Sequence, residues 1–236
     1  MKKNNKKRLK IVLLSLLALI LITIIGFYIY TLDYYKADDT AIQTIATGGS
    51  RTEIQGNLTI FYADNIENDT ALIFYPGGKV EAAAYTPILM KLAQNGITCV
   101  LVKMPFNLAV FNIDAADEIY DKLPNIKHWY ICGHSLGGAM ASSYVEKNAK
   151  RLEGLILLGA YPINNADIAT LAVYGSEDIK LDKTKLEQTK NKLMIQGGNH
   201  AYFGNYGEQK GDGTASITWD EQQRQTVQAI LDFIKK

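Results

Sequence analysis

The most informative run in this chain is Trp129-Tyr130-Ile131-Cys132-Gly133-His134-Ser135-Leu136-Gly137-Gly138-Ala139-Met140-Ala141, where an apolar segment stops at a serine bracketed by glycines. Aromatic and β-branched residues before the serine, and small or apolar residues after it, predict a strand, a sharp turn and a helix. A serine at such a turn takes a strained backbone conformation. Because strand and helix nearly touch there, the positions two before and two after must be small, and Gly133 and Gly137 meet that requirement.

Ser135 is therefore the candidate nucleophile. The predicted turn exposes its hydroxyl at the carboxyl edge of the sheet, and it leaves the Leu136 amide at a helix N-terminus, aimed where an oxyanion would form. The pentapeptide Gly-x-Ser-x-Gly is weak alone, because it occurs by chance in about one chain in ten of this length. The strand before it and the helix after it favour the catalytic interpretation.

The N-terminal segment has the charge pattern and the length of a membrane anchor. Residues 11–30 contain no charge, and the cations before them have no acidic neighbour: Lys2, Lys3, Lys6, Lys7, Arg8 and Lys10. At about 1.5 Å per residue, a helix of that length is about 30 Å long, which matches a bilayer core. We predict a basic cytoplasmic tail over residues 1–10, a transmembrane signal-anchor helix over residues 11–30 and a globular domain over residues 31–236.

A cleaved signal peptide is the alternative. Such peptides have a shorter apolar region and a small-x-small cleavage site, and residues 28–35 offer no such site. An uncleaved anchor is therefore favoured. The tyrosines that follow the apolar run suit the interfacial belt, and the basic tail keeps its own end in the cytoplasm. The domain is then predicted to lie outside the cytoplasm.

Composition excludes several other classes of function. The formal net charge is +1, but without the six tail cations 19 basic residues face 24 acidic ones, a balance of about −5 that argues against nucleic acid as a partner. The two cysteines, Cys99 and Cys132, lie in different apolar runs and are too few for a disulfide scaffold, so we expect buried thiols. No Cys/His cluster or phosphate-binding glycine loop suggests a metal or a cofactor.

Strands and helices alternate regularly beyond residue 70. Apolar runs predict strands at residues 71–75, 97–103, 129–132, 155–158, 170–174 and 193–196. A helix is predicted with Thr86 as its N-cap, Pro87 as its first residue and Gly96 at its end. Further helices are predicted at 113–123, 136–148 and 182–192, and after the Thr218-x-x-Glu221 capping box. The less regular part before them suggests a helix at 40–47 and two strands, 52–54 and 58–62, around Gly56. Continuous apolar strands indicate an α/β fold, a mostly parallel sheet with helices on both faces.

The three histidines are separated by their positions along this sheet, because working residues gather at the carboxyl ends of parallel strands. His128 lies just before its strand and so at the opposite edge. His134 is adjacent to the nucleophile, where neighbouring side chains point apart, and is expected to support the turn. His200 follows a strand in a glycine-rich loop and can reach the carboxyl edge, so it is the candidate base rather than an ordinary surface histidine.

The candidate acid follows the strand at residues 170–174. Glu177 and Asp178 both lie in the turn there, where carboxylates ordinarily serve solubility. Asp178 is preferred, because a shorter side chain placed later can curl back over the strand end. The chain order is then Ser135, Asp178 and His200, which is the serine–acid–histidine order of one particular fold.

From about residue 71 to the C-terminus, the sequence resembles the α/β-hydrolase superfamily, and most closely its compact, lid-less members of the dienelactone-hydrolase type. The resemblance rests on Tyr75-Pro76-Gly77-Gly78, Gly133-His134-Ser135-Leu136-Gly137-Gly138 and Gly197-Gly198-Asn199-His200-Ala201. It implies a triad of Ser135, Asp178 and His200, with an oxyanion hole formed by the Leu136 amide and by that of Gly78 or, less favoured, Lys79. Many relatives carry His-Gly where this chain has Pro-Gly. The backbone donor of the oxyanion hole does not need that histidine, so the departure leaves open only which residue of this turn supplies the amide.

The implied activity is hydrolysis of an ester-type bond in a small acyl substrate, through an acyl-enzyme and without a cofactor. Acyl transfer to another alcohol would use the same triad. A non-catalytic hydrolase-like binding domain at the cell surface is the alternative from another class. The intact triad argues against it, because a binding module has no reason to keep three matched residues.

Residues 161–168 form a connection too short for the helix or lid that many relatives insert there. Without a lid, a shallow site is expected. Aromatic side chains near the triad would either form a rim around this site or merely pack the histidine loop: Tyr161, Tyr202, Phe203 and Tyr206. A shallow site predicts a preference for short acyl chains, because each buried methylene contributes about 0.8 kcal/mol only while there is a wall to cover it.

Overall fold

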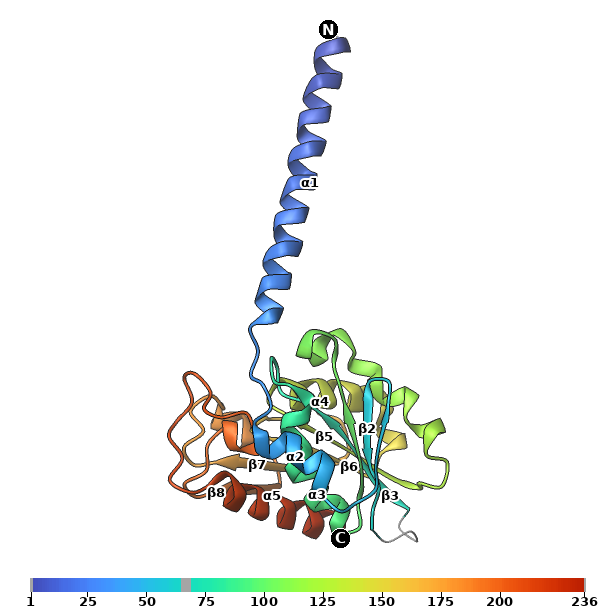
Figure 1. Cartoon of the computed structure of the whole chain (residues 1–236), viewed down its shortest axis with the longest axis vertical. Coiled ribbons are helices and arrows are strands. Elements are labelled where there is room, and N and C mark those ends of the chain that lie inside the picture. The colour runs from blue at the N-terminus through green and yellow to red at the C-terminus, as the bar shows by residue number, and fades with distance from the viewer. Residues whose placement is uncertain (1, 65–68, 236) are drawn as a thin grey trace. The chain divides into compact units, whose positions relative to one another are not determined.

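The computed structural model describes residues 2–64 and 69–235 (Figure 1). The chain divides into two units, Met1–Tyr34 and Tyr35–Lys236. The first unit is a single helix, α1 (Lys2–Leu32), of which the stretch Lys6–Leu32 is long and apolar enough to cross a membrane. By length and composition this helix suits either an anchor or a signal sequence.

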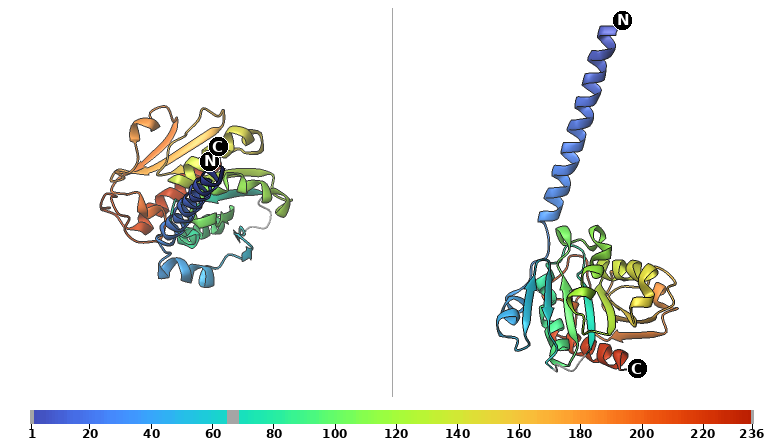
Figure 2. Two further views of the ribbon diagram at one scale, coloured as in Figure 1. Left: turned by 90° about the horizontal axis from the view of Figure 1, so that it is seen from above. Right: turned by 90° about the vertical axis from the view of Figure 1, so that its right-hand side faces the viewer.

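The second unit is built on one sheet of eight strands, ordered β1-β2-β4-β3-β5-β6-β7-β8. Its strands are β1 (Thr52–Gln55), β2 (Leu58–Phe61), β3 (Thr70–Tyr75), β4 (Thr98–Val102), β5 (His128–His134), β6 (Gly154–Leu158), β7 (Ala169–Gly175) and β8 (Asn191–Ile195). The pairs β1–β2 and β2–β4 are antiparallel, and all other pairs are parallel. Figure 2 shows the early strands at one end of the sheet and the late strands at the other.

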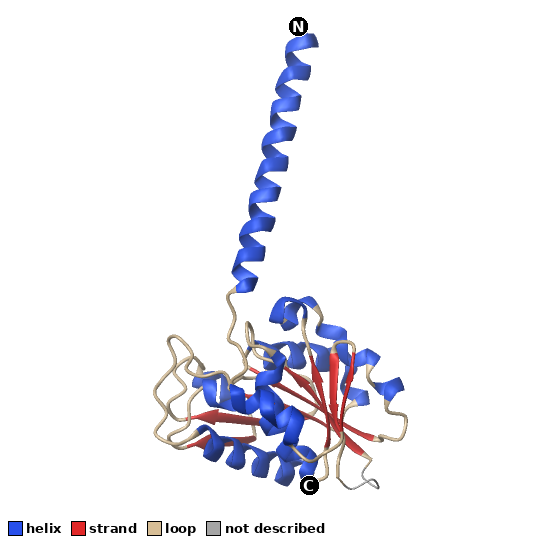
Figure 3. Ribbon diagram, in the orientation of Figure 1, coloured by secondary structure: helices blue, strands red, loops and turns tan. Residues whose placement is uncertain are grey.

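Helices cover both faces of the sheet, which lies between them in Figure 3. On one face α3 (Thr86–Gln94) and α5 (Trp219–Ile234) pack into an apolar cluster with Leu72, Cys99 and Cys132. On the other face α4 (Leu136–Asn148) packs with Ile73, Val100 and Ile131. Successive residues of a strand therefore point to opposite faces of the sheet, and both faces are covered by apolar clusters. This explains why the strands are apolar at every position. The predicted α/β fold is confirmed.

Several predicted local features are confirmed. Helix α2 (Asp39–Thr47) matches the expected segment, and β1 and β2 pair around Gly56 as a hairpin. Cys99 and Cys132 are buried free thiols, as expected. The Thr218 hydroxyl accepts a hydrogen bond from the Glu221 amide at the start of α5, although the Glu221 carboxylate pairs with Arg224 instead of completing the capping box.

The helix predicted at residues 113–123 is wrong in kind. The structure has two short 3₁₀ segments there, η4 (Ile113–Glu118) and η5 (Tyr120–Lys122). Their cause lies in β3, because the buried Tyr75 hydroxyl donates to the Ile113 carbonyl and accepts from the Ala116 amide. This tyrosine clamps the segment into a tight turn, and an apolar periodicity along residues 113–123 could not reveal so distant a partner.

The helix predicted at residues 182–192 is also wrong. Only a 3₁₀ turn, η7 (Lys183–Leu186), forms there, and β8 already begins at Asn191. The Asp182 carboxylate accepts the Thr184 amide at its start, and the Lys192 ammonium binds the Leu186 and Glu187 carbonyls at its end. A smaller error concerns α3, which starts at Thr86 itself because the 3₁₀ turn η1 (Ala82–Tyr85) leads directly into it.

Candidate active site

Ser135 sits at a strained turn between β5 and α4. Its φ of 52° and ψ of −120° lie outside the regions that non-glycine residues ordinarily adopt. The strain is held by close packing on both sides, because a Cβ at Gly133 would overlap the Gly137 backbone and one at Gly137 would overlap the Tyr75 carbonyl oxygen. The Ser135 amide donates to the Leu158 carbonyl at 2.9 Å, which ties the turn to β6. The predicted strand, turn and helix are thus present.

His200 and Asp178 form a buried pair. The distance from His200 Nδ1 to Asp178 Oδ2 is 2.9 Å, and the two side chains are 4% and 0% exposed. An ionised carboxylate only accepts hydrogen bonds, so Nδ1 carries the proton of this contact, and in the neutral tautomer the lone pair is then on Nε2. The other carboxylate oxygen, Oδ1, accepts the amides of Lys180 and Leu181, each at 3.0 Å. These contacts fix the carboxylate from both sides.

Glu177, the competing acid, makes different contacts. Its Oε1 accepts the hydroxyl of the neighbouring Ser176 at 2.9 Å, and its own amide donates to the Gly198 carbonyl. The side chain is only half-buried. The structure therefore brings His200 together with Asp178 and not with Glu177.

Ser135 and His200 line the same open cavity, of about 320 Å³, at the carboxyl edge of the sheet. The described residues include no hydrogen bond from the Ser135 hydroxyl to His200. In proteins without substrate such contacts are often long and tighten on binding. Gly159, at φ 52°, also lines this cavity, and a Cβ there would lie 3.0 Å from His200 Nδ1 and 3.2 Å from Asp178 Oδ2.

The two candidate oxyanion donors differ in their partners. The Lys79 amide already donates to the Asn107 carbonyl at 2.8 Å. Within residues 2–64 and 69–235, no hydrogen bond uses the Gly78 amide, and a Cβ at Gly78 would lie 2.8 Å from the Leu136 side chain. Gly78 thus lies against the residue that follows Ser135, which favours it over Lys79 as the second donor.

The other histidines occupy different environments. His128 is exposed at the start of β5, where its Nδ1 lies 3.1 Å from Glu153 Oε1. His134 is buried and contacts Tyr85 and the backbone of His200. Burial lowers the pKa of the His134 imidazole well below its usual value, and the neighbouring His200 lowers it further. His134 is therefore neutral at ordinary pH.

The four aromatic residues for which the sequence leaves both a rim and packing of the histidine loop open divide between different environments. Tyr161 lines the cavity, and its hydroxyl accepts the Lys185 ammonium at 3.0 Å. Phe203 is buried against His134, and Tyr206 is buried against Tyr35 and Tyr85, so these two pack the histidine loop. Tyr202 lines a separate small hollow. Phe203 and Tyr206 are buried in the loop because large aromatic side chains gain stability when their apolar area is removed from water.

Some residues of the cavity escaped the sequence analysis. Lys180, Leu181 and Gly159 all line it. Lys180 and Leu181 follow the acid directly, and Gly159 follows β6 at the same edge as Ser135. The signal that could have found Gly159 is its place at a strand's carboxyl end, where working residues gather.

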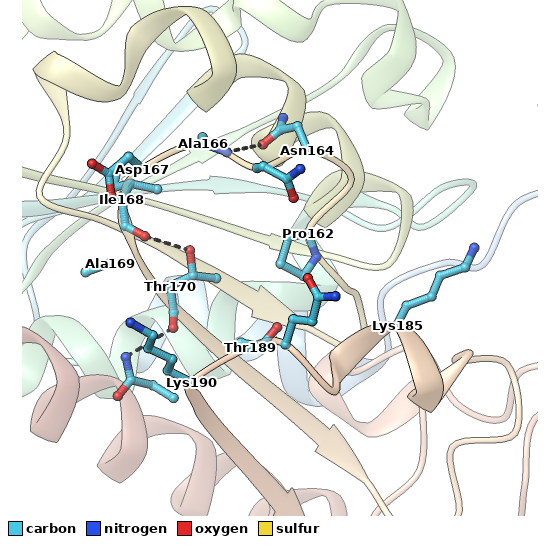
Figure 4. Close-up of a pocket in the computed structure, with 13 residues that line it drawn as sticks. Pro162, Asn164, Ala166, Asp167, Ile168, Ala169, Thr170, Lys185, Thr189 and Lys190 are labelled. Atoms are coloured by element: carbon cyan, nitrogen blue, oxygen red, sulfur yellow. Dashed lines mark hydrogen bonds between the residues drawn. The ribbon is translucent and has the colours of Figure 1, made fainter.

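Figure 4 shows a larger hollow, of about 450 Å³, that holds none of the three predicted triad residues. It lies where β7 and β8 begin, and Thr170, Thr189 and Lys190 are among the side chains around it. Working residues of parallel sheets gather at the opposite ends of the strands. This hollow therefore lies away from the strand ends at which the sequence predicts the catalytic residues.

Comparisons with known proteins agree with this fold. A model of the "Alpha/beta hydrolase family" matches residues 71–225. A sequence comparison with curated proteins gives no match.

Solved structures share the fold at low identity. Est1E from Butyrivibrio proteoclasticus is 16% identical over 80% of this chain and 100% of its own, with a TM-score of 0.57. A dienelactone hydrolase from Anabaena variabilis is 14% identical over 78% and 96%, with a TM-score of 0.56. An esterase from Pyrobaculum calidifontis is 13% identical over 83% and 89%, with a TM-score of 0.58. By the match over most of its length, the chain belongs to the alpha/beta hydrolase family.

Proposed function

We propose that this protein is a membrane-anchored serine hydrolase that cleaves a carboxylic ester or a similar acyl bond. The observation that carries the proposal is the buried His200–Asp178 pair, whose histidine lines one cavity with the strained Ser135. Burying a carboxylate is costly unless hydrogen bonds compensate it, so a buried Asp is weak evidence for a stabilising role. A catalytic role accounts for the position of the pair beside a candidate nucleophile.

The reaction follows from the roles of these groups. His200 Nε2 accepts the proton of the Ser135 hydroxyl while the oxygen attacks the acyl carbonyl. Asp178 holds the imidazole tautomer and stabilises its cation. The protonated His200 then gives its proton to the departing alcohol, and an acyl-enzyme remains. Water attacks the acyl carbonyl with the same assistance, which releases the acid and restores Ser135.

Two backbone amides are proposed to hold the negative charge on the substrate oxygen. The Leu136 amide is at the N-terminus of α4, where the helix dipole favours an anion. The second donor would be the amide of Gly78 in the turn after β3, a residue so close to Leu136 that a Cβ there would lie 2.8 Å from the Leu136 side chain. Removing one such donor from a hydrolase costs about 10²- to 10³-fold in rate.

A fluorophosphonate probe tests the proposal on the full-length protein in detergent. Such probes react only with an activated serine, so covalent labelling followed by peptide mapping should place the adduct on Ser135. A non-catalytic binding domain would not be labelled. Hydrolysis and acyl transfer are then separated by the products formed from an ester substrate with and without an added alcohol.

The anchor supplies a prediction on topology. With the basic tail inside and residues 11–30 across the membrane, protease added to intact cells or spheroplasts should digest the exposed loops of the domain. Complete protection before lysis would reverse this orientation. A mature chain that starts near Ala37 would instead favour a cleaved signal peptide.

The cavity supplies a prediction on substrate size. Its volume of about 320 Å³ is open to solvent, and Ile163 and Leu181 are among its few large apolar side chains. Since each methylene is worth about 0.8 kcal/mol only while it is covered, kcat/KM on p-nitrophenyl esters should peak at about two to four acyl carbons. A series of esters that differ only in chain length measures this. A peak at about ten carbons or more, or activation at an oil–water interface, would contradict the shallow site.

A further inference from the structure

Three buried hydrogen bonds connect the segment from Gly77 to Tyr85 with His134 at the end of β5 and with the loop that carries His200. The Gly77 amide lies 3.0 Å from the Tyr85 hydroxyl, which lies 2.7 Å from His134 Nδ1. On the other side of the imidazole, His134 Nε2 lies 3.0 Å from the His200 carbonyl oxygen. Tyr85 is 0% exposed, His134 1% and His200 3%. We call this chain of groups the His134 relay.

The chemistry of the groups gives the relay a single direction. A carbonyl oxygen only accepts, so His134 Nε2 must carry the proton that faces His200. A neutral imidazole then has a lone pair on Nδ1, which accepts the proton of the Tyr85 hydroxyl. The lone pairs of that hydroxyl receive the Gly77 amide. A proton on Nδ1 as well would prevent it from accepting the Tyr85 hydroxyl. Burial lowers the pKa of His134, so the imidazole stays neutral and Nδ1 remains an acceptor.

The turn after β3 is shaped to admit this relay. A Cβ at Gly77 would lie 2.7 Å from His134 Nδ1 and 2.8 Å from the Tyr85 hydroxyl oxygen. Any side chain at this position would therefore push the turn away from the imidazole. The ring of His134 is also enclosed, with its centroid 4.6 Å from that of His200 and 5.6 Å from that of Phe203.

The relay joins the parts that the proposed reaction must keep in register. Gly77 precedes the proposed oxyanion donor Gly78, His134 precedes the nucleophile Ser135, and the His200 carbonyl belongs to the base itself. A further hydrogen bond joins the same two loops, since the amide of Asn205, five residues after His200, donates to the Ala84 carbonyl at 2.7 Å, beside Tyr85. These hydrogen bonds can affect the reaction by holding Gly78, Ser135 and His200 in place, without any contact between the relay and the substrate.

We propose that Tyr85 and His134 are positioning residues, which set the base loop against the oxyanion turn through one directed chain of hydrogen bonds. This inference rests on the proposed serine hydrolase function. Catalysis of this kind tolerates little displacement, and a misplacement of about 1 Å can cost about 100-fold in rate. Loss of the relay should therefore lower kcat while substrate binding in the open cavity changes little.

Tyr85→Phe is the central test, made on the full-length protein in detergent. It keeps the ring and removes the hydroxyl that serves both Gly77 and His134. We expect kcat on a short p-nitrophenyl ester to fall about tenfold with KM within about twofold, and the rate constant of fluorophosphonate labelling to fall in parallel.

Tyr144→Phe is the matched control. Tyr144 is also a buried tyrosine, and its hydroxyl donates to Asp117 Oδ1 at 2.7 Å, away from the relay. Tyr85→Phe removes the hydrogen bonds to Gly77 and His134, and Tyr144→Phe removes those to Asp117 and Tyr120, so both substitutions should lower the melting temperature. Only Tyr85→Phe should lower kcat. Equal losses of kcat in the two variants, or none in Tyr85→Phe, would overturn the relay.

Two substitutions of His134 separate its two contacts. Glutamine can present an amide donor where Nε2 stands, and asparagine can present an acceptor where Nδ1 stands. If the contact with the His200 carbonyl positions the base, His134→Gln should retain several-fold more kcat than His134→Asn at similar KM. The opposite order would overturn that step.

Failure of the relay is distinguishable from failure of the proposed function. Wild-type protein that reacts with neither ester nor fluorophosphonate would refute the hydrolase proposal and, with it, the relay. Wild-type protein that reacts normally, while Tyr85→Phe reacts at the same rate, would refute the relay alone.

Discussion

Ser135→Ala should abolish fluorophosphonate labelling and lower the rate of ester hydrolysis by at least about 10⁴-fold. The expected loss is large because all covalent chemistry passes through one hydroxyl. The oxyanion amides and the cavity remain, so a small residual rate above that in water should persist. The measurement compares kcat/KM and labelling of the purified variant with those of the wild type.

The fold should survive this substitution. The strain at φ 52° is the same for serine and alanine, and the glycines that allow the close approach are untouched. Ser143→Ala, a half-buried serine on the same helix, is the matched control and should keep its activity within about twofold. Full labelling of the Ser135→Ala protein would mean that another residue is the nucleophile.

The sheet could be predicted because its strands carry their own signal. Residues buried on both faces must be apolar at every position, and the runs around Ile73, Val100 and Ile156 show it without any tertiary information. The turn at Ser135 could be predicted for a related reason, since Gly133 and Gly137 answer a local steric demand. In both cases the cause and the pattern lie in the same short stretch.

What could not be predicted depends on partners far away in the sequence. The 3₁₀ form of η4 is caused by hydrogen bonds to Tyr75 in β3. Tyr206 is buried, away from the cavity, because its ring packs on Tyr35 and Tyr85. The His134 relay is of the same kind. His134 could be excluded as the base from its neighbourhood to Ser135, but its bond to the His200 carbonyl requires the folded chain.

Asp178→Asn should lower kcat by about 10³- to 10⁴-fold while the fold is retained. The reason is that the two carboxylate oxygens of Asp178 have different partners. Oδ1 accepts the Lys180 and Leu181 amides, so the carbonyl oxygen of an asparagine would take that place and its NH₂ group would face His200. Nδ1 of His200 must then accept, which moves the ring proton to Nε2. An Nε2 that carries a proton cannot remove one from Ser135.

Glu177→Gln is the matched variant, one residue away and with the same change of an oxygen for an NH₂ group. It perturbs only the contact with the Ser176 hydroxyl, and the bond from the residue 177 amide to the Gly198 carbonyl stays. We expect its kcat to remain within about threefold of the wild type, measured on the same ester at the same pH. If Glu177→Gln were the inactive variant and Asp178→Asn the active one, Glu177 would be the acid. The two backbone bonds to Asp178 would then serve only to brace the loop.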